Sequence, residues 1–517
     1  MSPAQPMPLQ PDCPHSLEHL RGQLHQRLDQ VIHSCLHDHA ATSLLDFEKA
    51  LLPLLRSLGQ LLMQLFLLAR HRRLDLTPWL HGNRYRLADD YAPRTLQTSC
   101  GPVPYARAYL IPKSGPGPGV HPLDAELGLT RDSFSPLLIG WFCRLATRLS
   151  YGLACEMGGM FLDWAPAPAT VEEWVLGLGR PAYVYLTSGP LPEGDGEVLV
   201  VECDGKAAPT ATDEELAKRR GKRRAHGKAC DCGCQRHRGR AHRDRRGRKR
   251  RRKEGDKSKN GRSATLVVLY TLHRGPDGRL HGPINKKVFA TFGSRKKALE
   301  WARQQATRRG FGPDTQKTVQ IILDGELCLE KRMRQLFPKA ILTLDVRHAQ
   351  EKLWLAGRQF HPEGSAELRA WVEPLEGLLY QGRVEELLVR LRQALGRVSR
   401  RGPGTKGKRR TLSGVIGYLE KRVGLMEYGS WREQDLVIAS GVVEGAARYV
   451  VGERLDNSGM RWIEGRAEAV LLLRCIEVNG DWDSFWGWAE QQRRGELRSG
   501  QPLQIRSKVP TQLPEAA

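Results

Sequence analysis

The chain is short of acidic residues relative to basic ones. It has 57 Asp and Glu against 81 Lys and Arg, a formal net charge of +24 over 517 residues. This imbalance favours a polyanionic partner such as nucleic acid, but indicates no particular fold. The length predicts about three or four domains, and 40% hydrophobic residues are enough to form a sizeable core.

The sequence also lacks a long uninterrupted apolar run. Its most apolar stretch, residues 51–69, is broken by Arg56, Gln60 and Gln64, which is more typical of an amphipathic helix than of a membrane span. Residues 1–14 are polar and proline-rich, without the basic start and apolar core of a signal peptide. We therefore expect a cytoplasmic, nucleoid-associated protein with no membrane partner.

The cysteines show no pairing rhythm. There are 11 of them, an odd number, which favours free thiols in a reducing compartment over a disulfide framework. Cys230, Cys232 and Cys234, with His237 nearby, are candidate Zn²⁺ ligands, although their spacing is tighter than that of a usual zinc knuckle. A reduced, unstructured basic loop is the alternative, and both interpretations stay open.

Most of the positive charge is concentrated in one segment. Residues 218–262 contain 22 Lys and Arg against four acidic residues, a net charge of +18, and almost nothing apolar. We predict that residues 212–262 form a flexible insertion that neutralises DNA phosphates. The DNA-binding residues expected in this segment are Arg219, Arg223, Arg245, Arg250 and Lys253.

After residue 190 the apolar pattern changes from helical spacing to short, nearly continuous runs. The expected strands are 198–201, 265–272, 287–292, 319–323 and 340–344, with helices at 294–309 and 327–337. Three strands, a helix, then two strands joined by a helix make a mixed-sheet α/β arrangement with the strand order of an RNase H-like fold. The expected domains are an N-terminal helical region (1–92), a small β segment with a helical DNA-binding region (93–190), the first part of the α/β core (191–347), a helical insertion (348–437), the last part of the core (438–492) and a disordered tail (493–517).

Three acidic residues stand where a metal-dependent nuclease would need them. Asp204 and Asp324 each end an expected strand and precede glycine, while Glu444 lies at the start of an expected helix. A single Asp-Gly pair usually marks only a turn, and Glu444 also fits an ordinary helix capped by Ser440. Two carboxylates at strand ends and one on a helix can nevertheless converge on a pair of Mg²⁺ or Mn²⁺ ions.

Two further motifs surround these acids. Asp345 and His348 follow the last expected strand, where Asp345 fits either a helix N-cap or a residue that supports the metal site. His348 is a weaker ligand candidate because Mg²⁺ prefers oxygen. Arg461 and Trp462 follow the Glu444 helix in an expected loop that can hold a phosphate or stack a base.

In this order, the motifs resemble those of DDE transposases of bacterial insertion sequences, in the Mutator-like group and closest to its Kra-type members. The family also often carries a cysteine pair after a strand corresponding to residues 106–111, and this chain has none there. The matching residues are Asp204-Gly, Asp324-Gly, Phe337-Pro-Lys-Ala, Asp345, His348, Leu353-Trp354, Ser440-Gly, Glu444, Gly459-Met460, Trp462 and Asn479 to Trp486, with Pro122-Leu-Asp upstream.

The resemblance implies an RNase H-like catalytic core interrupted by an all-helical insertion and preceded by helical and small β DNA-binding regions. Asp204, Asp324 and Glu444 would hold two Mg²⁺ ions that serve both cutting at the element ends and joining of the 3′-OH ends to target DNA. The implied partners are terminal inverted repeats and target DNA, with a homodimer or larger assembly on DNA. The alternatives are a non-catalytic DNA-binding protein derived from a transposase and an RNase H-like nuclease acting on RNA.

Overall fold

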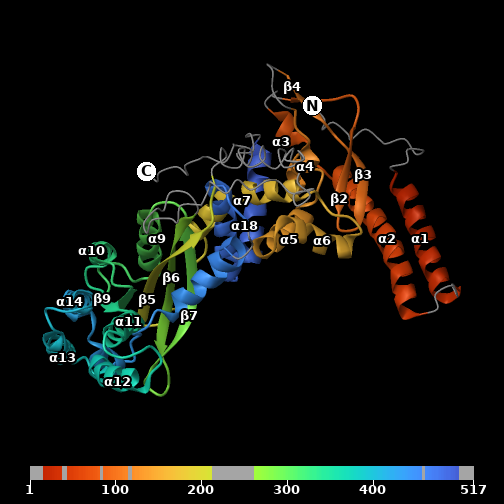
Figure 1. Cartoon of the computed structure of the whole chain (residues 1–517). Coiled ribbons are helices and arrows are strands. Elements are labelled where there is room, and N and C mark those ends of the chain that lie inside the picture. Colours follow the sequence, from red (N-terminus) through yellow and green to blue (C-terminus); the bar gives the residue numbers. More distant parts are fainter. Residues whose placement is uncertain are drawn as a thin grey trace, which may run out of the picture. The chain divides into compact units, whose positions relative to one another are not determined.

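The computed structural model describes residues 16–37, 43–81, 85–113, 119–211, 261–456 and 460–499. The chain divides into two compact units. The first comprises Met1–Leu178 and Trp482–Ala517, and the second comprises Gly179–Asp481. The first unit is mainly helical with two small sheets, and the second contains a five-stranded mixed sheet, so the protein is a mixed α/β protein (Figure 1).

The first unit combines a helical N-terminal part with two antiparallel strand pairs, β1–β4 and β2–β3. One face of the β2–β3 hairpin packs with α2 and α4 around Leu67, Leu96, Val103 and Leu123. Its elements are α1 (Leu17–His37), α2 (Leu44–Arg72), α3 (Thr77–Leu80), β1 (Tyr85–Leu87), β2 (Ala92–Thr98), β3 (Gly101–Arg107), β4 (Leu110–Pro112), α4 (Pro122–Leu127), α5 (Pro136–Arg148), α6 (Tyr151–Leu162), the first half of α7 (Pro168–Ser188) and α18 (Trp482–Ser499).

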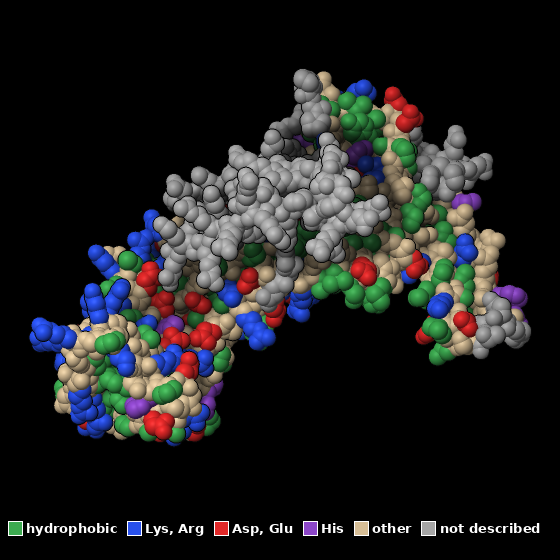
Figure 2. Space-filling model, viewed as in Figure 1, with side chains coloured by type: hydrophobic (Ala, Val, Ile, Leu, Met, Phe, Trp, Pro, Cys, Tyr) green, Lys and Arg blue, Asp and Glu red, His purple; other side chains and the backbone are tan. Residues whose placement is uncertain are grey.

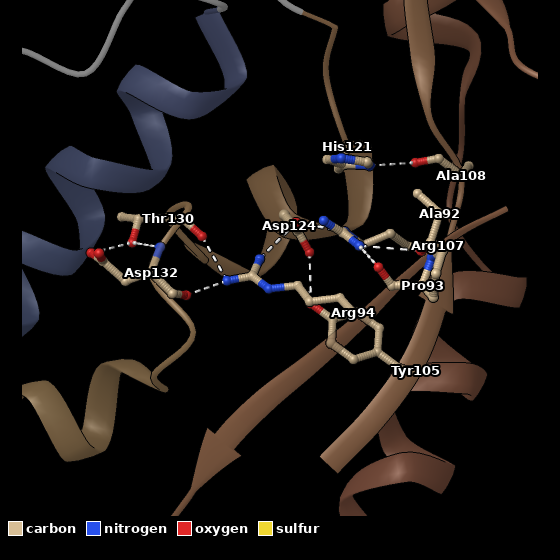
Figure 3. Close-up of polar contacts among 10 residues, drawn as sticks. All are labelled: Ala92, Pro93, Arg94, Tyr105, Arg107, Ala108, His121, Asp124, Thr130 and Asp132. Atoms are coloured by element: carbon tan, nitrogen blue, oxygen red, sulfur yellow. Dashed lines mark hydrogen bonds and ion pairs between the residues drawn. The ribbon is translucent and has the colours of Figure 1, made fainter. Parts of the chain in front are cut away.

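A buried carboxylate joins the hairpin to α4 (Figure 3). Asp124 accepts hydrogen bonds from Arg94 Nη1 at 2.8 Å, Arg107 Nε at 2.7 Å and the Tyr105 hydroxyl at 2.8 Å. The side chains of Asp124 and both arginines are only about a tenth exposed. Two guanidinium groups therefore compensate the cost of burying this carboxylate, and the Pro122-Leu-Asp motif has a structural role.

The second unit is built on a sheet with strand order β7-β6-β5-β8-β9. The β5–β6 and β6–β7 pairs are antiparallel, whereas β5–β8 and β8–β9 are parallel. Its elements are β5 (Val198–Ala208), β6 (Arg262–Arg274), β7 (Leu280–Thr291), α9 (Arg295–Arg308), β8 (Thr318–Leu323), α10 (Leu327–Leu336), β9 (Ile341–Leu344), α11 (Val346–Gly357), α12 (Ala366–Tyr380), α13 (Val384–Arg397), α14 (Thr405–Glu420), η3 (Val423–Leu425), α15 (Tyr428–Glu433), α16 (Gly441–Ala446), the π-helical η4 (Ala447–Asp456) and α17 (Glu464–Val478).

Both faces of this sheet are covered. Nine consecutive residues of β6 are buried, which requires cover on each side because successive side chains alternate between faces. Helix α9 packs on β6 and β7, where Trp301 stacks on Phe289 at 5.0 Å, and α16, η4 and α17 also pack on the sheet. Helices α11 to α15, which we call the helical segment, lie in the chain between β9 and α16.

The five strands and two helices that we expected between residues 198 and 344 are present. An expected boundary elsewhere in the chain is wrong. Helix α18 continues to Ser499, so residues 493–499 are helical and not part of a disordered tail. Helix α5 begins after an N-cap at Ser135, and α7 begins at Pro168. In each of these two helices proline occupies the first position, where its missing N–H costs nothing.

Helix α2 exposes an apolar stripe. Its exposed side chains include Leu52, Leu55, Leu62 and Phe66, and hydrophobic side chains are visible along α1 and α2 in Figure 2. Among the described residues, α2 is the one helix long and apolar enough to cross a membrane by length and composition alone. The absence of a membrane partner therefore stays a prediction.

Candidate active site

Three aspartates lie in one row of the sheet, where the parallel pairings of β5 with β8 and of β8 with β9 stop. The parallel register of β5 with β8 ends at the pair Glu202 and Ile322, and two residues further along the chain from each stand Asp204 and Asp324. The register of β8 with β9 ends at Leu323, and the next residues are Asp324 and Asp345. Neighbouring strands lie about 5 Å apart, so these aspartates are successive neighbours across the sheet. Figure 2 shows acidic side chains gathered over the part of the second unit where β5, β9 and α11 lie.

Asp204 lies inside β5 and not at its end, so this part of the sequence interpretation is wrong. Antiparallel pairing with β6 continues to Ala208, opposite Arg262, after the parallel pairing with β8 has stopped. Asp204 is half-buried, and its carboxylate accepts the N–H of Gly205 at 2.6 Å. Asp204 therefore lies where the parallel pairing of β5 with β8 has stopped, and its side chain is partly exposed to solvent.

Asp324 follows β8 in a tight turn. Its carboxylate accepts the N–H of Glu326 at 2.8 Å, and Gly325 adopts a φ of +88°, a conformation that favours glycine. Helix α14 of the helical segment fixes this turn from outside. The Tyr418 hydroxyl donates to the Asp324 carbonyl at 3.1 Å, and Arg422 Nε donates to the Gly325 carbonyl at 2.9 Å.

Asp345 is fully buried and caps α11, as one of the two sequence interpretations held. It accepts the N–H of Arg347 at 2.9 Å and the hydroxyl of Ser440. Ser440 precedes α16 but makes no side-chain cap there, unlike in the alternative of an ordinary capped helix, because its hydroxyl is directed to Asp345. A second link joins the N–H of Val346 to the carbonyl of Ile438 at 2.9 Å. Asp345 thus connects the end of β9 with the start of α16.

Glu202 is a buried residue of the site that the sequence interpretation missed. It stands two residues before Asp204, so both side chains point to the same face of β5. It accepts the Tyr270 hydroxyl at 2.6 Å and the N–H of Val443 at 2.7 Å, which ties α16 to the sheet beside Glu444. A glutamate inside the apolar run 198–203 is the signal that could have revealed it.

The electrostatics of Glu202 reflect this position. Burial raises the pKa of its carboxyl to about 7, helped by the negative charges of Asp345 and Glu444, while the hydrogen bonds from Tyr270 and Val443 oppose the shift. Burial is thus the main cause of the raised pKa, and the neighbouring carboxylates add to it. A local excess of carboxylates is typical of sites that bind cations or carry out proton transfer.

Glu444 lies on α16 and is exposed. Arg347, at the start of α11, places its Nη1 3.1 Å from the Glu444 carboxylate, and this side chain of Glu444 is 46% exposed. The guanidinium supplies a positive charge beside this carboxylate. Since the pair is exposed to solvent, it contributes little to stability and can exchange for another partner.

The carboxylates fit a divalent cation in their chemistry. Asp204 and Asp324 are adjacent in the row, each accepts a backbone N–H, and each carboxylate has further lone pairs for the oxygen coordination that Mg²⁺ prefers. Within the described ranges, however, no three His, Cys, Asp or Glu side chains lie close enough together to hold a metal ion.

Comparison with known proteins does not assign this chain to a family. No protein-family model and no curated protein matches this chain. The resemblance to transposases thus depends on the motifs alone.

Trp462 does not present its ring to solvent, so the expectation that it stacks a base is wrong for this structure. The ring is 4% exposed, its Nε1 donates to the Leu455 carbonyl at 3.1 Å, and the Arg454 guanidinium lies 4.7 Å from its centre. Its backbone pairs with residues 209 and 211, immediately after β5. Trp462 therefore holds the chain after η4 against the end of β5. Arg461, the preceding residue, is half-buried.

His348 lies on α11 one turn beyond Asp345, with Nδ1 3.4 Å from the Glu351 carboxylate. The structure does not place it in the row of aspartates. The remaining expected site residues lie outside the described residues. They are Arg219, Arg223, Arg245, Arg250 and Lys253, expected to bind DNA, and Cys230, Cys232, Cys234 and His237, expected to bind Zn²⁺.

Proposed function

We propose that this chain is a DDE-type DNA transposase with an RNase H-like core, in which the helical segment is an insertion before the third acid. The observation that supports this best is the row of Asp204, Asp324 and Asp345 where the parallel pairings of β5, β8 and β9 stop, beside a helix that carries Glu444. The ordered motifs and the net charge of +24 point in the same direction.

The proposal gives the acids distinct roles. Asp204, Asp324 and Glu444 would hold two Mg²⁺ ions, which when bound activate an attacking oxygen and stabilise a leaving oxygen at phosphorus. Asp345 and Glu202 position these ligands, because one fixes the junction of β9 with α16 and the other fixes α16 against β5. The attacking group would be water for cutting at the element ends and the freed 3′-OH for joining to target DNA.

The partners follow from charge and geometry. The basic segment at residues 218–262 would neutralise backbone phosphates without reading sequence, so the first unit would have to recognise the terminal repeats. Coordinated cutting of two ends needs two active sites. We therefore expect a homodimer or larger assembly on paired end DNA, where DNA neutralises the repulsion between two basic chains.

Cleavage of DNA carrying the element ends, identified as short inverted repeats in the DNA flanking the gene, tests the proposal. Asp204→Asn, Asp324→Asn and Glu444→Gln are each expected to abolish Mg²⁺-dependent cleavage with little change in folding or DNA binding. Asp314→Asn is the matched control, because Asp314 is an exposed acid of the same unit outside the row. Cleavage retained within about tenfold would remove that residue from the catalytic set.

The two alternatives give different results in the same assay. A non-catalytic DNA-binding protein would bind the ends and cut nothing in any metal. An RNase H-like nuclease would cut RNA or an RNA–DNA hybrid in preference to end DNA, with the same three acids required.

A further inference from the structure

A small cleft lies at the end of the five-stranded sheet where β8 and β9 begin. Its walls come from the C-terminal parts of α9 and α10, the loop after α9 and the first residues of β8. The row of aspartates lies at the other end of β8 and β9, and the six residues of β8 span about 20 Å. The cleft is therefore separate from the candidate active site. The lining residues that define what we call the β8–β9 cleft are Arg303, Thr307, Phe311, Thr315, Lys317 and Lys339.

The lining of the β8–β9 cleft is basic. Arg303, Lys317 and Lys339 are all exposed, and among the described residues no acidic side chain lines the cleft. Asp314 belongs to the loop after α9 but is not part of the lining. Within the described ranges, none of the three cations pairs with a carboxylate, so their charge is available to an anion.

The neighbours of the cleft hold its donors in place. The Lys317 ammonium lies 4.8 Å from the centre of the Phe311 ring, a cation–π contact that limits its freedom. The Thr315 hydroxyl accepts the N–H of Lys317 at 3.1 Å, which leaves its own O–H to donate. The Ala306 carbonyl, at the end of α9, already accepts the N–H of Phe311 at 2.8 Å. The last turn of α9 therefore does not depend on a lysine as its hydrogen-bond donor.

The size of the cleft selects the kind of anion. Its volume is about 30 Å³, whereas one buried water needs on the order of 10–15 Å³, so it accepts a few oxygen atoms and no sugar or base. A backbone phosphodiester has substituents on two sides and a single negative charge. A free phosphate or the terminal phosphate of a monoester has at least three unsubstituted oxygens and a charge of roughly −1.5 to −2 at neutral pH. Three cations suit a terminal phosphate better than a diester.

We propose that the β8–β9 cleft binds a terminal phosphate, either free or as the end group of a small phosphate monoester. Arg303, Lys317 and Lys339 balance its charge, and the hydroxyls of Thr307 and Thr315 donate to its oxygens. Hydrogen bonds from cationic groups to phosphate oxygens are roughly twice as strong as those between neutral groups. The bound phosphate would join α9 to the start of β9, and the assignment does not depend on the proposed function.

Hydrogen exchange of the full-length protein in the presence of inorganic phosphate tests the proposal. A local measurement is needed because the basic segment at residues 218–262 also attracts phosphate. Phe311, Thr315 and Ala340 line the cleft, and their amides donate to backbone carbonyls, so their exchange reports on it. Chloride at equal ionic strength is the reference. With phosphate at about ten times its Kd, exchange at these amides is expected to slow about tenfold.

Two variants remove one cation each. Lys317→Gln and Lys339→Gln are each expected to raise the Kd for phosphate about tenfold, because each loses one charge-assisted hydrogen bond. Lys286→Gln is the matched control, because Lys286 is an exposed lysine of β7 that does not line the cleft, and it is expected to keep the wild-type Kd. If Lys317→Gln disturbs the loop around Phe311, Lys339→Gln decides, because Lys339 lies after α10 and outside that loop.

Phenyl phosphate and dimethyl phosphate distinguish the possible anions. Slower exchange with both inorganic phosphate and phenyl phosphate assigns the cleft to a monoester, and slower exchange with inorganic phosphate alone assigns it to the free anion. Dimethyl phosphate that acts as strongly as inorganic phosphate indicates a diester contact and overturns the proposal. A wild type whose exchange at these amides does not respond to phosphate, or a folded Lys339→Gln with the wild-type Kd, overturns it as well.

Discussion

The buried carboxyl of Glu202 should make the stability of the second unit depend on pH, and Glu202→Gln should remove that dependence. Glutamine has nearly the same shape. Its carbonyl can accept the N–H of Val443, and its amide can donate to the Tyr270 hydroxyl, which then turns to accept. The variant therefore keeps the two contacts of Glu202 and loses only its ability to ionise.

The size of the effect follows from the shift of the Glu202 pKa from an ordinary 4.5 to about 7, caused first by burial. A raised pKa means that the folded state holds the proton more tightly than the unfolded state. The stabilisation is fully present below pH 4.5 and is lost as the pH rises through about 7. A pKa raised from 4.5 to about 7 corresponds to roughly 3 kcal/mol of unfolding free energy.

Chemical denaturation of the metal-free protein between about pH 4.5 and pH 8 measures this quantity. The wild type and Glu202→Gln should have similar unfolding free energies at the acidic end, and the variant should be the more stable by up to about 3 kcal/mol at the basic end. Glu197→Gln, at an exposed glutamate just before β5, should follow the wild type. Equal pH slopes for wild type and Glu202→Gln would refute the reasoning.

Three further predictions concern other parts of the chain. Asp124→Ala should destabilise the first unit by about 3–5 kcal/mol, because it leaves two buried guanidiniums without a carboxylate to balance their charge. Asp483→Ala, which removes an exposed ion pair, should change the stability of the first unit by less than about 0.5 kcal/mol. Hydrogen exchange of β2 and β3 should distinguish the two variants. The N–H of Ala108 donates to Nε2 of His71, and burial lowers the pKa of His71 below its ordinary 6.5. The stability of the first unit should therefore be full above pH 6.5 and fall as the pH drops below it. Denaturation at about pH 5 and pH 8 should show this loss in the wild type and not in His71→Gln. Deleting residues 218–260 should weaken binding to all DNA sequences alike and flatten its salt dependence, whereas a loss confined to terminal repeats in titrations at several salt concentrations would contradict a purely electrostatic role.

The order of strands and helices in the second unit could be predicted from the sequence because it depends on local pattern. The apolar run before Asp324 is a strand, and Gly325 ends it with a backbone conformation that favours glycine. The end of β5 could not be predicted in this way. Its extension past Asp204 to Ala208 depends on pairing with β6, whose partner residues lie more than fifty positions further along the chain.

The candidate site was predictable in its acids and not in their partners. Asp204, Asp324 and Asp345 stand out because each follows an apolar run. The contacts of Glu202 depend on long-range packing against Tyr270 and Val443, and no local rule indicates them. Trp462 shows the opposite error, since a tryptophan in a short polar loop suggests an exposed ring and only the tertiary contacts with Leu455 reveal its burial.

The hydrogen bonds from Ser440 to Asp345 and from Val346 to Ile438 hold the two ends of the helical segment next to each other. A segment that leaves and rejoins a domain at the same point adds little loop-closure entropy when its length changes. Helices could therefore be gained or lost between these two ends while Glu444 keeps its distance from β5. The exterior of the segment can diversify at little cost to the chemistry, except at the contact of α14 with the Asp324 turn, where any remodelling must preserve Tyr418 and Arg422.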